Sequence, residues 1–137
     1  MEEINRKKMK KYLFAFTLII LGAGSTKAQT KAPDWKEQKQ FHALMSGSFH
    51  PAEEGNFAPL KQKADSLLIV AKLWNASAIP SNYQPTKTKE TLAVLVKNCS
   101  TLQQAVKENK TDAELKKIIA EAHDTFHKLV GECKKED

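Results

Sequence analysis

The sequence predicts an all-α protein, a single up-down-up-down four-helix bundle that follows a cleaved signal peptide. Three observations support this fold class. A positively charged stretch leads into a short apolar run near the N-terminus. Glycine and proline concentrate at a few positions that divide the rest of the chain into four segments. Within each segment apolar residues recur every three or four positions, the period of an amphipathic helix, and no segment alternates as a strand does.

The first 28 residues have the layout of a secretory signal peptide. Lys10 and Lys11 supply the positive charge, and residues 13–21 form the apolar run. Small residues then lead to Ala28, which fits the residue before a cleavage site. We therefore expect export to the periplasm and a mature N-terminus at Gln29.

Two features of this leader argue against a membrane anchor. The apolar run is shorter than a transmembrane helix, and no cysteine stands at the cleavage point to carry a lipid. The remaining residues, 29–137, are enough for one domain and too few for two. We expect a signal peptide over residues 1–28 and a helical domain over residues 29–137, whether translation starts at Met1 or at Met9.

The charge of the mature chain bears on its partners. The whole sequence holds 22 basic and 16 acidic residues, and the leader takes six and two of them, which leaves 16 and 14. A chain so close to neutral lacks the basic patch that binding to phosphate backbones requires. Nucleic acid is therefore not an expected partner.

The first two helices are bounded by prolines. The first is expected to begin at the N-cap candidate Asp34 and to end at His50, because Pro51 disfavours the α conformation in the residue before it. The second is expected to follow Pro59 and to end before Pro80. Their inward residues are predicted to be Phe41, Leu44, Met45 and Phe49 in the first helix and Leu60, Ala64, Leu67, Leu68, Ala71 and Trp74 in the second.

The last two helices begin at threonines. The third opens near Thr86 or Thr88, and the fourth has Thr111 as N-cap with Glu114 three residues on, which predicts a capping box. We expect the first helix to lie beside the fourth and the second beside the third. The inward residues are predicted to be Leu92, Leu95, Cys99, Leu102 and Val106 in the third helix and Leu115, Ile118, Ala122, Phe126, Leu129 and Cys133 in the fourth.

The two cysteines are not expected to pair within one chain. When the third and fourth helices run antiparallel, Cys99 and Cys133 lie about 21 Å apart along the bundle, which is farther than a disulfide can reach. We expect Cys99 to be a small core residue. Cys133 is expected to be exposed enough to form an intermolecular disulfide and hence a dimer.

Three histidines are candidate metal ligands. His123 and His127 are one turn apart and point the same way from the fourth helix. At about 100° per residue both lie on one flank of its apolar stripe, and His42 lies on the matching flank of the first helix. If these flanks face each other, the three imidazoles meet with a fourth position open, a set that suits zinc or copper.

His50 is expected to lie outside that site. Eight residues of helix, about 12 Å, separate it from His42. We expect it to begin a longer, irregular loop over residues 50–57. There it either joins Glu53 and Glu54 in a cation site or belongs to a solvated turn, in which Gly55 and Asn56 supply unusual backbone angles.

A family resemblance adds a second candidate ligand. The run from His123 to His127 resembles the haem-attachment run CxxCH of the cytochrome c-prime family, with His123 and Phe126 where the cysteines stand. Phe126-His127 together with Met45 is similar to the ligand pattern of the soluble b-type cytochromes, which hold a non-covalent haem b. The resemblance covers residues 34–134. It implies a four-helix bundle that carries haem for electron transfer, with Met45 and His127 as ligands.

Three functions are thus open. The bundle binds a transition metal through His42, His123 and His127, or it binds haem through Met45 and His127, or it is a structural or interaction module without a small ligand. We do not expect an enzyme, because the chain has neither a nucleophile elbow nor a phosphate-binding glycine loop. The Glu-x-x-His pairs of a di-iron bundle are also missing.

Overall fold

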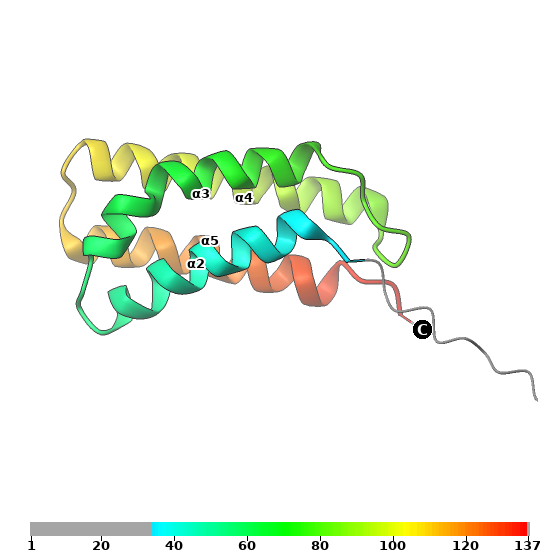
Figure 1. Cartoon of the computed structure of the whole chain (residues 1–137), viewed down its shortest axis with the longest axis horizontal. Coiled ribbons are helices and arrows are strands. Elements are labelled where there is room, and N and C mark those ends of the chain that lie inside the picture. Colours follow the sequence, from blue (N-terminus) through cyan, green and yellow to red (C-terminus); the bar gives the residue numbers. More distant parts are fainter. Residues whose placement is uncertain (1–33, 137) are drawn as a thin grey trace, which may run out of the picture. The chain divides into compact units, whose positions relative to one another are not determined.

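The computed structural model describes residues 34–136, which form four α-helices around one apolar core (Figure 1). The helices are α2 (Lys36–Glu53), α3 (Ala58–Ala76), α4 (Pro85–Lys107) and α5 (Asp112–Glu132). Each helix packs against the next along the chain, and α2 also contacts α5. The predicted all-α class is confirmed, whereas the signal peptide of residues 1–28 lies outside the described residues. Among the described helices, none has both the length and the apolar character needed to cross a membrane.

At one end of the bundle, aromatic residues next to the helix termini pack against one another. Trp35, just before α2, packs against Trp74 near the end of α3, with 5.4 Å between ring centroids. Trp35 also contacts Tyr83, just before α4, at 5.0 Å. Tyr83 in turn forms an isolated β-bridge with Lys134, just after α5. The starts of α2 and α4 therefore lie beside the ends of α3 and α5.

The predicted apolar stripes form the core, with small shifts at their edges. Leu44, Val106 and Ile118 are only partly buried, whereas the other predicted inward residues are buried. Ala105 and Ile119, each one residue away from a predicted position, are buried instead. A straight helix has 3.6 residues per turn, so residues spaced strictly three and four apart move gradually away from the buried face along its length.

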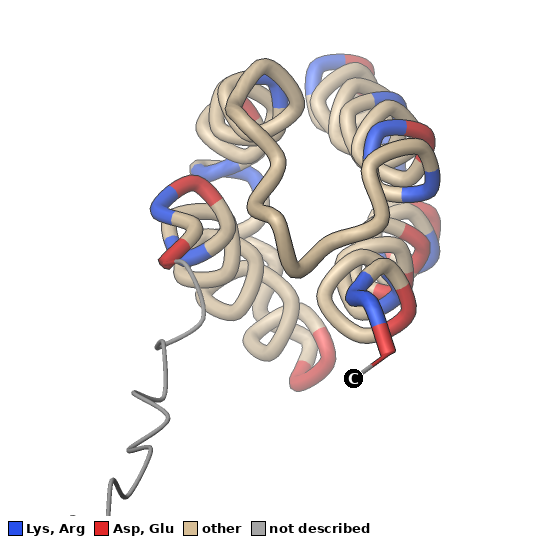
Figure 2. Tube along the Cα trace, turned by 90° about the vertical axis from the view of Figure 1, so that its right-hand side faces the viewer, with Lys and Arg blue, Asp and Glu red and all other residues tan. Residues whose placement is uncertain are grey.

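Acidic and basic residues are interspersed along the described helices (Figure 2).

The predicted end of the first helix is wrong: α2 does not stop at His50 but continues to Glu53, with Pro51 inside its last turn. Proline has no N–H to donate to the carbonyl four residues earlier, which here belongs to Gly47. The Lys63 ammonium of α3 donates to that carbonyl oxygen instead, at 3.2 Å. A neighbouring helix thus compensates for the hydrogen bond that the proline removes.

The loop between α2 and α3 is consequently shorter than expected and spans residues 54–57. Gly55, at φ +89°, ends α2, and the Asn56 N–H donates to the Pro51 carbonyl at 2.8 Å. This is the Schellman pattern, which requires a left-handed residue. Asn109, at φ 52°, plays the same role after α4. The longest connection is instead residues 77–84, between α3 and α4.

The two predicted N-caps differ in outcome. The capping box of α5 is confirmed, because the Thr111 hydroxyl accepts from the Glu114 N–H at 3.3 Å and the Glu114 carboxylate accepts from the Thr111 N–H at 2.9 Å. Asp34 is not the N-cap of α2. Trp35 takes that position, and the Asp34 carboxylate forms an ion pair with Lys39 at 2.8 Å.

Both cysteines are free and fully buried. This confirms the expectation for Cys99 and makes the expected exposure of Cys133 wrong. The Cys133 thiol lies 3.5 Å from the Thr91 hydroxyl, and its carbonyl accepts from the Gln84 N–H at 2.8 Å. The connection between α3 and α4 thus covers the end of α5, a contact between distant segments.

Candidate functional site

All four histidines of the chain line one pocket between α2 and α5. The pocket has a volume of about 240 Å³. His42 and His50 come from α2, and His123 and His127 come from α5. Its remaining lining residues are Met45, Ser46 and Phe126.

His123 and His127 form the closest pair of imidazoles in this pocket. Their Nε2 atoms lie 3.1 Å apart, and their ring centroids lie 4.4 Å apart. One Nε2 must carry the hydrogen and the other must accept it, so at least one ring is neutral. Two imidazole nitrogens bound to a tetrahedral zinc ion are about 3.3 Å apart, given Zn–N bonds of about 2.0–2.1 Å. The spacing of the pair is therefore close to the spacing that one metal ion requires.

The surroundings of His123 favour its neutral form. Partial burial is the main cause that lowers its pKa, and the neighbouring His127 lowers it further. Asp124 opposes this shift, His50 adds to it, and Glu53 opposes it. A neutral imidazole is the form that binds metal, so the site favours the ligating state of His123.

Two aromatic stacks join the helices on either side of the pocket. Phe49 of α2 stacks on His123 of α5, with 3.8 Å between centroids and 8° between planes. Conversely, Phe126 of α5 stacks on His42 of α2, at 5.4 Å and 4°. Phe126 also contacts the ring of His127 at 5.6 Å. The first stack holds one face of His123, whereas the second holds His42 flat against a phenyl ring.

The structure brings the three predicted ligands to one pocket but does not gather them around one point. Within residues 34–136, no three His, Cys, Asp or Glu side chains are close enough to hold a metal ion as they stand. The pair of His123 and His127 is formed, and His42 remains packed on Phe126. Binding by all three therefore stays a prediction.

The expectation that His50 lies outside the site is wrong, because His50 lines the same pocket as the other three histidines. Its ring centroid lies 6.4 Å from that of His123. The separation of His42 and His50 along α2 is no obstacle, because His123 faces the His50 end of the pocket. The His50 Nδ1 also lies 3.3 Å from a Glu53 carboxylate oxygen. The spacing of three residues between His50 and Glu53 was visible in the sequence, but Pro51 concealed that they share a helix.

The haem ligands predicted from the family resemblance both line the pocket, in different environments. The Met45 side chain belongs to the core and is only 1 % exposed, whereas His127 is exposed. Cavities that hold drug-sized organic ligands measure about 300–1,000 Å³, and haem is a large member of that class. The pocket, about 240 Å³, is smaller than that range.

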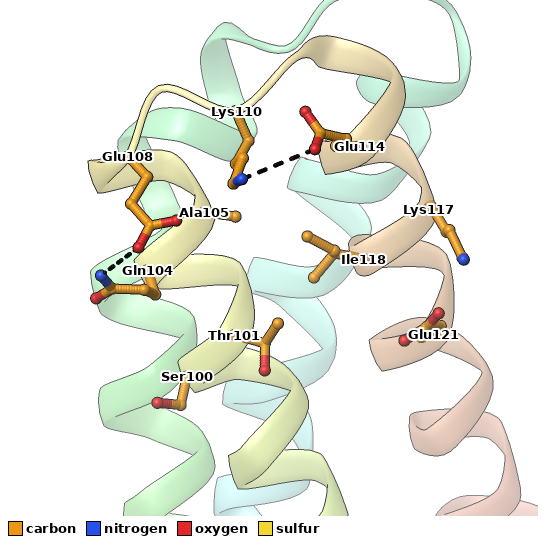
Figure 3. A pocket seen from close by; sticks show the side chains of 10 residues that line it. All are labelled: Ser100, Thr101, Gln104, Ala105, Glu108, Lys110, Glu114, Lys117, Ile118 and Glu121. Atoms are coloured by element: carbon orange, nitrogen blue, oxygen red, sulfur yellow. Dashed lines mark hydrogen bonds and ion pairs between the residues drawn. The ribbon is translucent and has the colours of Figure 1, made fainter.

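A larger cavity, about 530 Å³, lies between α4 and α5 (Figure 3). Four of its polar side chains pair with one another. The Lys110 ammonium lies 3.9 Å from the Glu114 carboxylate, and the Gln104 amide donates to Glu108 at 2.8 Å. A few convergent polar groups mark a binding site, and the smaller pocket gathers four imidazoles. The smaller histidine pocket is therefore the better candidate.

Comparison with known proteins found no match to this chain among family models, curated proteins or solved structures. The four-helix fold agrees with the fold that the cytochrome resemblance implies, but no family match supports a cytochrome identity. The function must therefore be argued from the pocket itself.

Proposed function

We propose that this chain is an exported, non-enzymatic protein that binds one divalent transition metal ion, zinc or copper, in the pocket between α2 and α5. The observation that carries the proposal is the 3.1 Å separation between the Nε2 atoms of His123 and His127. Imidazole is a ligand that both metals favour. The proposal includes an up-down-up-down bundle over residues 29–137, released from the signal peptide of residues 1–28.

The position of the pair supports a site with defined geometry. Both histidines stand on one long helix, where side chains one turn apart keep a fixed spacing. Phe49 covers one face of His123, which limits how far that ring can turn. Ligands held on rigid elements lose less conformational freedom on binding than ligands on loops.

The apolar core supports cargo binding rather than a structural role for the metal. The core runs through all four helices, from Trp35 to Cys133, and the pocket contributes only Met45 and Phe126 to it. Chains that need a metal to fold lack such a core. An exported protein with an open, partly exposed histidine site fits the buffering or carrying of metal ions in the periplasm.

Calorimetric titration with zinc and with copper(II) tests this proposal. We expect one ion per chain for the unaltered protein and a rise in Kd of at least about tenfold for His123→Ala and for His127→Ala, equivalent to about 1.4 kcal/mol. Gln40→Ala removes an exposed polar side chain of α2 outside the pocket and is the matched control, with an expected Kd within about twofold of the original.

Three results would contradict the proposal. Equal metal binding by the unaltered chain and by the double variant His123→Ala/His127→Ala would place the metal elsewhere. Stoichiometric binding of haemin with a Soret band that is lost in Met45→Leu would favour the haem function instead. Binding of neither ligand would leave the chain a structural or interaction bundle.

A further inference from the structure

We infer that His50 is the third metal ligand of this site and that Glu53 positions it for that role. The inference rests on the metal binding proposed above. It replaces His42 with His50 in the predicted ligand set and gives a site of three imidazoles with a fourth position open to water or to an exchange partner.

The contact between His50 and Glu53 selects the ligating nitrogen. The His50 Nδ1 lies 3.3 Å from the Glu53 carboxylate oxygen Oε2. A carboxylate at Nδ1 keeps the hydrogen on that atom and leaves the Nε2 lone pair free for a metal. His123 and His127 also meet through their Nε2 atoms. All three imidazoles would therefore bind through the same nitrogen.

Two of the three separations between the rings bracket the value for a tetrahedral site. Ring centroids of imidazoles that share one tetrahedral zinc ion lie about 5 Å apart, given Zn–N bonds of about 2.0–2.1 Å. The His123 centroid lies 4.4 Å from that of His127 and 6.4 Å from that of His50. The His50 side chain is 61 % exposed, so it is free to turn toward the pair. Binding as the third ligand requires the His50 ring to turn about its side-chain bonds toward the pair.

The backbone that carries His50 and Glu53 is held against α5. The Lys116 ammonium of α5 donates to the Glu53 carbonyl at 3.4 Å, beside the end of α2. This contact exists because α2 continues through Pro51. His42 is also exposed, but its ring is stacked parallel to that of Phe126, and a turn toward a metal ion bound by the pair would separate these two rings.

Zinc titrations of single variants test the inference. We expect His50→Ala to raise the Kd for zinc at least about tenfold and its matched control, His42→Ala, to leave it within about twofold. Glu53→Ala should raise the Kd about tenfold, as expected for removal of a carboxylate that orients a metal-bound histidine. Glu53→Gln keeps an oxygen acceptor and should recover part of the affinity, whereas Glu54→Ala should change nothing.

Cobalt(II) absorption supplies a readout that a merely structural role would not move. Four-coordinate cobalt gives intense visible bands, which His50→Ala should weaken while His42→Ala preserves them. If His42→Ala, and not His50→Ala, weakens zinc binding, or if Glu53→Ala behaves as Glu54→Ala does, the inference is overturned while the proposed function stands. If the unaltered chain binds no zinc, the proposed function itself fails.

Discussion

The imidazoles of His123 and His127 face each other across one turn of α5, with 3.1 Å between their Nε2 atoms. In the free chain this contact is a hydrogen bond between two rings, of which at least one is neutral. A metal ion that enters between the same two atoms needs only a slightly wider separation, about 3.3 Å. This separation supports the metal site proposed above, and the predictions below test the stack on His123, three features of the surrounding bundle, and the binding itself.

Loss of the stack on His123 should weaken metal binding. Phe49→Leu keeps an apolar side chain but removes the parallel ring, which lies 3.8 Å from His123. We expect a stability loss of about 1 kcal/mol and a several-fold rise in the Kd for zinc, because His123 can then turn away from His127.

Phe57→Leu is the control, since Phe57 is also buried but, unlike Phe49, does not stack on His123. Chemical denaturation and zinc titration of both variants separate the two effects. If Phe57→Leu and Phe49→Leu weakened zinc binding equally, the stack would have no role in holding the ligand.

Alanine in place of glycine ordinarily stabilises a helix, but the contact between Lys63 and Gly47 should cancel that gain in stability at position 47. A Cβ at position 47 would meet the Lys63 ammonium at 2.6 Å, the same nitrogen that donates to the Gly47 carbonyl. We expect Gly47→Ala to leave stability unchanged or lower in the original chain and to raise it by about 1 kcal/mol in the Lys63→Met background. Denaturation of the four proteins gives the double-mutant cycle. Identical effects of Gly47→Ala in both backgrounds would be inconsistent with the contact.

The sequence predicted the helical core well because periodicity is a local property. The stripe of α3, from Leu60 to Trp74, and the capping box at Thr111 depend on residues within one helix, so each could be derived from spacing. Pro51 could not be placed correctly, because the hydrogen bond that compensates for it comes from Lys63, in another helix. Cys133 was misjudged for the same reason, since the connection between α3 and α4 covers it.

The site was predicted in part. Helical angles placed His123, His127 and His42 on matching flanks of two helices, and the structure does bring them to one pocket. Helical angles describe one helix at a time. They could not show that Phe49 stacks on His123 or that Phe126 stacks on His42, because each stack joins a ring of α2 to a ring of α5. Because the sequence predicted that α2 ends at His50, it did not indicate that His50 also lines this pocket.

The capping box of α5 should stabilise the fold less at low pH. Hydrogen bonds from the Thr111 side chain and backbone lower the pKa of Glu114 below its ordinary value of 4.5. A carboxyl with a depressed pKa stabilises the folded chain above its unfolded pKa and loses that contribution as pH falls through its folded pKa. Thr111→Val should therefore lower the Tm more at pH 7 than at pH 3.

Thr101→Val is the matched control, because the Thr101 hydroxyl donates only to the Lys97 carbonyl within its own helix. Its effect on the Tm should be the same at both pH values. A pH-independent effect of Thr111→Val would show that the hydrogen bond from the Thr111 hydroxyl to the Glu114 carboxylate contributes nothing to the cap.

Neither thiol should react in the folded chain. Burial raises the pKa of Cys99 to about 12, and Cys133 is fully buried beside Thr91. We expect a water-soluble disulfide reagent to modify no cysteine until the chain is unfolded, and non-reducing electrophoresis to show no disulfide-linked dimer. Rapid labelling of Cys133 under native conditions would mean that the contact between the end of α5 and residues 77–84 opens readily.

Binding at the histidine pocket can be followed atom by atom in nitrogen-15 spectra of the imidazole rings, recorded while zinc is added up to one equivalent. We predict that the Nε2 signals of His123 and His127 move together toward the zinc-bound position, that His50 follows them, that His42 stays unchanged, and that all changes stop at one equivalent. Unchanged His123 and His127 signals after one equivalent, or small shifts of all four rings that never saturate, would contradict a metal site in this pocket.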